Sequence, residues 1–172
     1  MISRTLIVLR HAKAETPGDL VDFDRALTER GESDADAAGA WLADERLHPE
    51  LVLCSPARRT RQTWQTAAIA LAQGENGRPS PEVRYEESLY LAGRTEVFDL
   101  LRLVPDTIRT VLLVGHNPTV SEVSALLLPD DQFSGTVIEM KTAGLAVHTS
   151  EEPWSATQPG AMRLTRRHTA RG

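Results

Sequence analysis

The sequence has a single cysteine, few aromatic residues and no long hydrophobic run. Cys54 is the only cysteine among 172 residues, so an internal disulfide cannot form. Its position at the end of the apolar segment 51–54 favours a small buried side chain over a reactive thiol. Aromatic residues make up 5% of the chain, and no stretch approaches the roughly 20 apolar residues of a membrane span. We therefore expect neither a disulfide-stabilised nor a membrane-spanning protein.

The chain also lacks an excess of positive charge. Its formal net charge is -5, with 41% hydrophobic and 25% charged residues, which is the composition of a globular protein. Such a charge gives no general attraction to nucleic acid or to acidic membranes. The first ten residues hold an apolar run that is too short for the core of a signal peptide. We expect a cytoplasmic, monomeric protein that binds neither nucleic acid nor membranes.

Apolar segments alternate with helix-like segments, which is typical of an α/β fold with a largely parallel sheet. The pattern predicts strands at 5–10, 51–54 and 110–115, a shorter strand within 82–90, and one or two strands within 136–150. It predicts helices at 29–46, 95–104 and 117–128, the first with Thr28 as N-cap. It predicts a further helix directly after Ser55, which can cap it. Residues 1–160 are expected to form one domain, and the basic end at 161–172 is expected to fray.

Polar residues follow three of the predicted strands at the point where each strand ends. The segments are LIVLRH at 6–11, LVLCSPARR at 51–59 and VLLVGHNP at 111–118. Because the carboxyl ends of parallel strands meet at one edge of a sheet, Arg10, His11, the turn at 55–59 and His116 should converge. Arginines beside backbone N–H groups at helix starts suit a phosphate or another compact oxyanion. The histidines lack metal-ligand spacing, so nucleophilic attack by histidine is the chemistry that remains.

These segments resemble the histidine phosphatase superfamily, and within it the SixA-like phosphohistidine phosphatases. LRHAKAE at 9–15 resembles the Arg-His signature of the family, SPARRTRQT at 55–63 its Ser-x-x-x-Arg-Ala-x-Gln-Thr segment, and VGHNP at 114–118 the segment of its second histidine. DRALTERG at 24–31 matches a fourth segment, while Thr60 departs from the alanine of the family pattern. The resemblance implies a single-domain three-layer α/β/α fold with a largely parallel central sheet, as in the phosphoglycerate mutases.

The resemblance also implies roles for individual residues. Arg10 and Arg59 are expected to bind phosphate, His11 to act as the nucleophile, and His116 to be the second histidine at the phosphate. Arg25 of DRALTERG is a further expected phosphate ligand. No metal and no cofactor are implied.

Many members of the superfamily carry a proton-donating glutamate or aspartate near the third strand. Glu86 and Glu87 are the candidates here, but both could equally lie at an exposed strand end, and a different register places Ser88 at the position. A site without an acid would suit phosphohistidine, because imidazole leaves more readily than an alkoxide.

The leading hypothesis is therefore a SixA-like phosphatase that hydrolyses protein-borne phosphohistidine through a covalent intermediate on His11. The chain has little room for insertions over the pocket, so we expect an exposed site that admits a phosphohistidine-bearing protein or a small phosphorylated substrate. One alternative is a phosphatase of small phosphomonoesters. Another is a non-catalytic module that binds phosphoproteins, although pure binding would not require His11.

Overall fold

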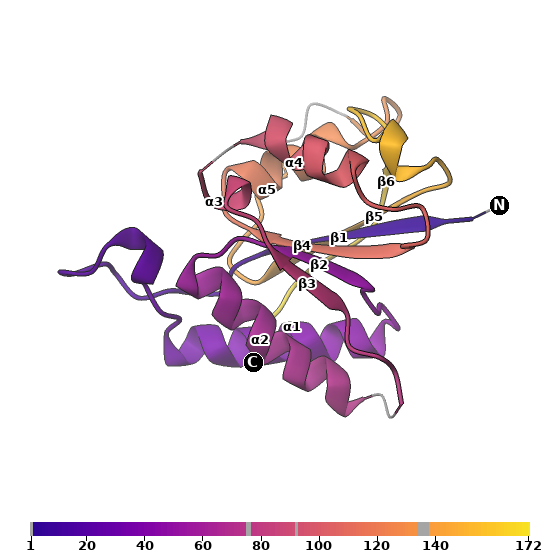
Figure 1. Ribbon diagram of the computed structural model, residues 1–172. Helices are drawn as coiled ribbons and strands as arrows, with labels where there is room; N and C mark the ends of the chain where they lie inside the picture. The colour runs from indigo at the N-terminus through magenta and orange to yellow at the C-terminus, as the bar shows by residue number, and fades with distance from the viewer. Residues whose placement is uncertain (1, 75–76, 92, 134–137) are drawn as a thin grey trace.

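The computed structural model describes residues 2–74, 77–91, 93–133 and 138–172, and its centre is one six-stranded sheet (Figure 1). The strand order is β3-β2-β4-β1-β5-β6. The strands are β1 (Arg4–Arg10), β2 (Leu51–Cys54), β3 (Glu82–Tyr85), β4 (Thr110–Gly115), β5 (Gly144–Ser150) and β6 (Arg163–Thr169). The pairs among β1 to β4 are all parallel, whereas β5 is antiparallel to β1 and β6 to β5. The expected largely parallel sheet is confirmed.

Helices cover both faces of the sheet, which explains the continuous apolar runs of its central strands. One face carries α1 (Glu29–Asp44) and α2 (Arg58–Gln73), and the other carries α3 (Ser88–Leu91), α4 (Arg94–Arg102) and α5 (Thr119–Leu126), as Figure 1 shows. A separate cluster of buried apolar side chains fills each of the two layers between helices and sheet. Within the described residues, no helix is both long and apolar enough to cross a membrane.

Helix α1 packs closely against its neighbours because glycine stands at two contact points. A Cβ atom on Gly39 would lie 2.1 Å from the carbonyl oxygen of Ala67 in α2, and one on Gly31 would lie 2.0 Å from that of Lys13. The Thr28 side chain accepts a hydrogen bond from the backbone N–H of Gly31, which confirms the predicted N-cap. The start of α1 is thereby fixed against the segment that follows β1.

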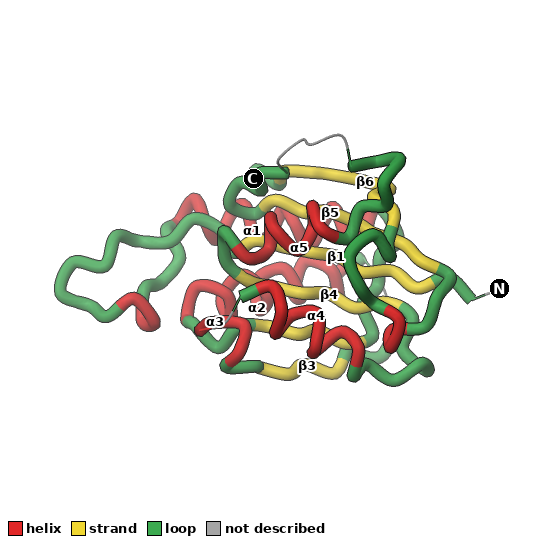
Figure 2. Tube along the Cα trace, turned by 90° about the horizontal axis from the view of Figure 1, so that it is seen from above, coloured by secondary structure: helices red, strands yellow, loops and turns green. Residues whose placement is uncertain are grey.

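The segment between β1 and α1 forms a loop that projects from the body of the molecule (Figures 1 and 2). Its base is closed by backbone hydrogen bonds, from Glu15 N–H to the Ala26 carbonyl at 2.8 Å and from Thr28 N–H to the Lys13 carbonyl at 2.9 Å. Its outer part carries the short 3-10 turn η1 (Asp22–Asp24), which has no buried residue. The loop is thus anchored at its base and exposed at its tip.

Two details differ from the sequence-based expectations. Helix α2 begins at Arg58 with Ala57 as N-cap, so Ser55 does not cap it. The basic C-terminal end does not fray, because β6 pairs with β5 and the backbone N–H of Gly172 donates to Asp34. The expected late strand is β5, and residues 136 and 137 of the range 136–150 lie outside the described part of the chain. Backbone hydrogen bonds along an edge suffice to hold a polar strand that has no apolar pattern.

Candidate active site

The predicted convergence of three strand ends is confirmed. The backbone N–H of His11 donates to the Gly115 carbonyl at the end of β4, and that of Ser55 donates to the Val114 carbonyl, each at 3.1 Å. The ring centroids of His11 and His116 lie 5.3 Å apart. The Ser55 hydroxyl oxygen lies 2.7 Å from Nε2 of His116, which explains why this serine does not serve as a helix cap. The carboxyl ends of β1, β4 and β2 therefore form one polar site.

The ring of His11 is held in one orientation and kept neutral. Its Nδ1 lies 2.7 Å from the carbonyl oxygen of Ala12, so Nδ1 carries the proton and donates it there. The pKa of His11 is lowered to about 4, chiefly by burial and also by the charges of Arg59, Arg10 and Arg25, against the opposing effect of the Ala12 carbonyl. Near pH 7 the Nε2 lone pair is therefore available as a nucleophile.

His116 is also neutral. Burial is the largest cause that lowers its pKa to about 3, and Arg59 and His11 act in the same direction. Its Nδ1 is buried and has no hydrogen-bond partner within the described residues. The ring of Tyr90 packs edge-on against the ring of His116, with centroids 5.7 Å apart. The site thus holds two uncharged imidazoles in contact with each other.

Three arginines surround these rings, as the sequence predicted. Arg59 lies in the first turn of α2 with a side chain that is 6% exposed, whereas Arg25 lies after η1 on the projecting loop. Arg10 ends β1 and donates from Nη1 to the Met140 carbonyl at 2.9 Å. Each of the three charges is close enough to lower the pKa of His11. Their arrangement can neutralise the charge of an oxyanion placed beside His11.

Asp22 is a site residue that the sequence analysis did not find. Its carboxylate accepts hydrogen bonds from Arg59 Nη2 at 3.0 Å, from Arg25 Nε at 3.0 Å and from the Tyr90 hydroxyl at 2.8 Å. Burial opposes ionisation, but the Tyr90 hydrogen bond and the two arginines outweigh it and lower the pKa of Asp22 to about 2. The only signal in the sequence was the spacing of three residues between Asp22 and Arg25.

The two glutamates proposed as general acids lie elsewhere in the contact network. Glu86 continues from β3, where its backbone N–H donates to the Cys54 carbonyl, and its charge raises the pKa of Arg84. Glu87 is exposed and lines a small cavity together with Phe23 and with Tyr90, whose hydroxyl donates to Asp22. Among the described residues, neither glutamate makes a hydrogen bond or ion pair with the histidines and arginines of the site.

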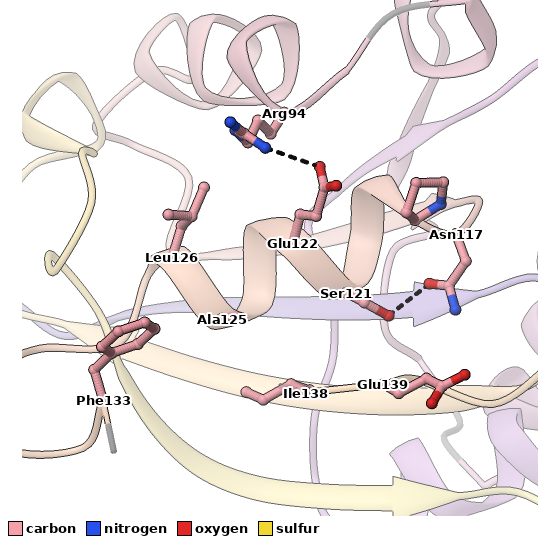
Figure 3. A pocket seen from close by; sticks show the side chains of 10 residues that line it. Arg94, Asn117, Ser121, Glu122, Ala125, Leu126, Phe133, Ile138 and Glu139 are labelled. Carbon is pink, nitrogen blue, oxygen red and sulfur yellow. Dashed lines mark hydrogen bonds and ion pairs between the residues drawn. The ribbon is translucent and has the colours of Figure 1, made fainter. Parts of the chain in front are cut away.

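A larger cavity of about 730 Å³ lies beside the His116 turn (Figure 3). Asn117 and Glu139 lie at one end of it, and Leu126 and Phe133 lie at the other. The Asn117 side chain donates to the Met140 carbonyl at 2.8 Å, and the same carbonyl accepts a hydrogen bond from Arg10. The polar end of this largely apolar cavity is therefore joined to Arg10 through one shared acceptor.

A three-layer fold with two histidines and several arginines at the carboxyl ends of parallel strands defines the phosphoglycerate-mutase-like class. The model of the histidine phosphatase superfamily (branch 1) matches residues 6–84. A proposed phosphohistidine phosphatase SixA of Nakamurella multipartitia shares 31% sequence identity, covers 99% of this chain and 98% of its own, and superposes with a TM-score of 0.85. The chain belongs to the histidine phosphatase superfamily.

Other relatives agree with this assignment over nearly the whole chain. A proposed phosphohistidine phosphatase SixA of Agrobacterium tumefaciens shares 30% identity over 95% of this chain and 97% of its own, with a TM-score of 0.75. An uncharacterized protein of Mycobacterium tuberculosis is 34% identical over 168 residues, which are 95% of this chain and 100% of that protein. The similarity therefore extends beyond the segments that carry the histidines.

Proposed function

We propose that this chain is a metal-independent phosphatase that hydrolyses phosphohistidine carried by a protein, through a covalent phosphohistidine on His11. The observation that carries the proposal is the state of His11, a neutral imidazole whose Nδ1 donates to the Ala12 carbonyl while arginine charges surround it. A fixed tautomer presents the lone pair of Nε2 to phosphorus, which is what a nucleophilic histidine requires.

In the first half of the reaction, Nε2 of His11 attacks phosphorus and the bond from phosphorus to the substrate imidazole breaks. The leaving imidazole takes the electron pair and gains its proton from solvent. Arg10 and Arg59 stabilise the negative charge on the phosphoryl oxygens as the group moves. In the second half, water attacks phosphorus, the bond to Nε2 breaks, and inorganic phosphate and neutral His11 are formed.

The ionised state of Asp22 favours phosphohistidine over an alkyl phosphate as the substrate. Asp22 is the one carboxylate that hydrogen-bonds to the arginines of the site in the described part of the chain, and it is ionised near pH 7. A carboxylate without a proton cannot protonate a departing alkoxide, whereas an imidazole leaves without that help. The two relatives proposed as phosphohistidine phosphatases are consistent with this substrate class.

A phosphatase of small phosphomonoesters is the second candidate, and the cavity of about 730 Å³ beside Asn117 favours it. A cavity of this volume can enclose the organic part of a small phosphate ester while the phosphate contacts the arginines. The two candidates differ in which leaving group is hydrolysed fastest.

The deciding experiment compares matched phosphohistidine and phosphoserine peptides with a panel of small phosphomonoesters, with EDTA present throughout. We expect the highest kcat/KM for the phosphohistidine peptide. Replacing His11 by Asn should lower that value by at least about a thousandfold. His168→Asn is the matched control, because His168 lies on β6 at the edge of the sheet and stacks on Trp41 of α1, and it should retain activity. Fastest hydrolysis of an alkyl phosphate would replace the proposal, and no phosphate release from any compound would support a binding module.

A further inference from the structure

The arginines assigned to substrate phosphate already hold an anion that belongs to the chain itself. Arg59 donates from Nη2 to the Asp22 carboxylate at 3.0 Å and from Nη1 to the Asp22 backbone carbonyl at 2.9 Å. Arg25 contacts the other carboxylate oxygen from Nε at 3.0 Å and from Nη2 at 2.8 Å. The Tyr90 hydroxyl also donates to the carboxylate, at 2.8 Å. Residue 22 thus occupies the same donors that a bound phosphate would use.

Residue 22 covers the terminal nitrogens of the Arg59 guanidinium. Both terminal nitrogens donate to residue 22, and the buried Nε has no partner within the described residues. A guanidinium carries five N–H donors, so a phosphate can reach the free Nε–H of Arg59 with Asp22 in place, but it can receive two parallel hydrogen bonds from the two terminal nitrogens only if Asp22 moves away. Substrate phosphate and Asp22 therefore compete for the terminal nitrogens of Arg59.

The position of Asp22 makes such an exchange inexpensive. Its side chain is 49% exposed, whereas that of Arg59 is 6% exposed, so the carboxylate can return to water while the guanidinium stays in place. Asp22 lies in the η1 turn on the outer part of the projecting loop, beyond the base that the hydrogen bonds of Glu15 and Thr28 close, and beside Phe23, whose ring packs edge-on against Tyr90. Because η1 has no buried residue, its movement would free Arg59 without opening the core.

We propose that Asp22 is an internal competitor of phosphate. After hydrolysis its carboxylate binds Arg59 and Arg25 again and thereby lowers the affinity of the site for the phosphate product. The inference rests on the proposed function, because it assumes that phosphate binds beside His11. Three arginine charges would hold a phosphate dianion tightly, and slow release would then limit turnover. A carboxylate tethered next to the same arginines lowers the affinity for phosphate and shortens its residence.

Calorimetric titration with inorganic phosphate tests this role in the wild type and in three variants. Asp22→Asn keeps the shape of the side chain but removes its charge, and it should bind phosphate about tenfold more tightly, the scale of one charge-assisted hydrogen bond. Tyr90→Phe removes one donor from Asp22 and should shift the affinity in the same direction by a smaller factor. Asp24→Asn makes the same charge change two residues away, where no arginine contact exists among the described residues, and should leave the affinity nearly unchanged.

Steady-state kinetics with an aryl phosphate provide the second measurement. In Asp22→Asn the KM and the inhibition constant of phosphate should both fall, and kcat should fall where product release limits the rate. Weaker or unchanged phosphate binding in Asp22→Asn would overturn the inference and make Asp22 a residue that positions Arg59. Equal tightening in Asp24→Asn would also overturn it, because a general charge effect would then suffice.

The failure of the inference can be told apart from the failure of the proposed function. If the wild type binds phosphate and its turnover depends on His11, while Asp22→Asn binds no more tightly, only the role of Asp22 is refuted. If neither the wild type nor any variant binds phosphate, both the phosphate site and the competitor role are refuted. Binding by Asp22→Asn alone would support the competitor role.

Discussion

Acidification should destabilise this protein strongly, because three of its histidines are buried as neutral groups. Burial lowers the pKa of His11 and His148 to about 4 and is the largest cause that lowers the pKa of His116 to about 3. In the unfolded chain a histidine titrates near pH 6.5. Between that value and the folded pKa, the unfolded state binds protons that the folded state does not bind, so stability falls as the pH falls.

The size of the effect follows from these pKa values. Each histidine lowers the unfolding free energy by about 1.4 kcal/mol for each pH unit below pH 6.5, which amounts to a loss of about 2 kcal/mol by pH 5. The three together should remove about 6 kcal/mol, a large share of the roughly 5 to 15 kcal/mol that stabilises a typical domain. The Asp22 carboxylate acts in the same direction but at lower pH. Its lowered pKa stabilises the folded protein at neutral pH, and this stabilisation is lost only as the pH falls below the ordinary pKa of aspartate.

Urea unfolding at pH 7, 6 and 5, followed through the fluorescence of the three tryptophans, of which Trp64 and Trp154 are buried, measures the effect. We expect a steep fall of the unfolding free energy with falling pH in the wild type. The slope should be about one third smaller in His11→Asn, which removes one of the three titrating groups. An unfolding free energy that is constant from pH 7 to pH 5, or an unchanged slope in the variant, would refute the reasoning.

Arg59→Ala should slow turnover of an aryl phosphate by at least about a hundredfold. Arg61→Ala should have a small effect, because the Nε of Arg61 donates to the Pro56 carbonyl, and equal losses in the two variants would contradict the assignment of Arg59. Glu86→Gln and Glu87→Gln should each leave the kcat/KM for a phosphohistidine peptide nearly unchanged, and a large loss in either would identify a proton donor. The Cys54 thiol, whose pKa burial raises to about 12, should react with iodoacetamide only after unfolding, so labelling of the native protein would count against its burial.

The sequence predicted those features that depend on continuous local patterns. The apolar runs of β1, β2 and β4 identified buried parallel strands, and that arrangement alone required Arg10, His11, Ser55 and His116 to meet.

Other features depend on contacts between distant segments and leave no local signal. Asp22 reaches Arg59 across 37 residues and Tyr90 across 68, and no pattern near Asp22 indicates either partner. The β6 strand is held by backbone pairing to β5 along an edge, so its arginine-rich sequence resembles a solvated tail. Serine is a common helix cap, but the hydroxyl of Ser55 forms a hydrogen bond with His116 instead.

The place of β4 in the sheet has a consequence for how the protein is made. β4 pairs with β1 on one side and with β2 on the other, although it follows both of them in the chain. Until it inserts, β1 and β2 have no strand to hold them at their final separation of about 10 Å, twice the spacing of neighbouring strands. A nascent chain that ends before Thr110 therefore carries His11 and Ser55 without a shared site, and the two residues come together only after β4 has been made.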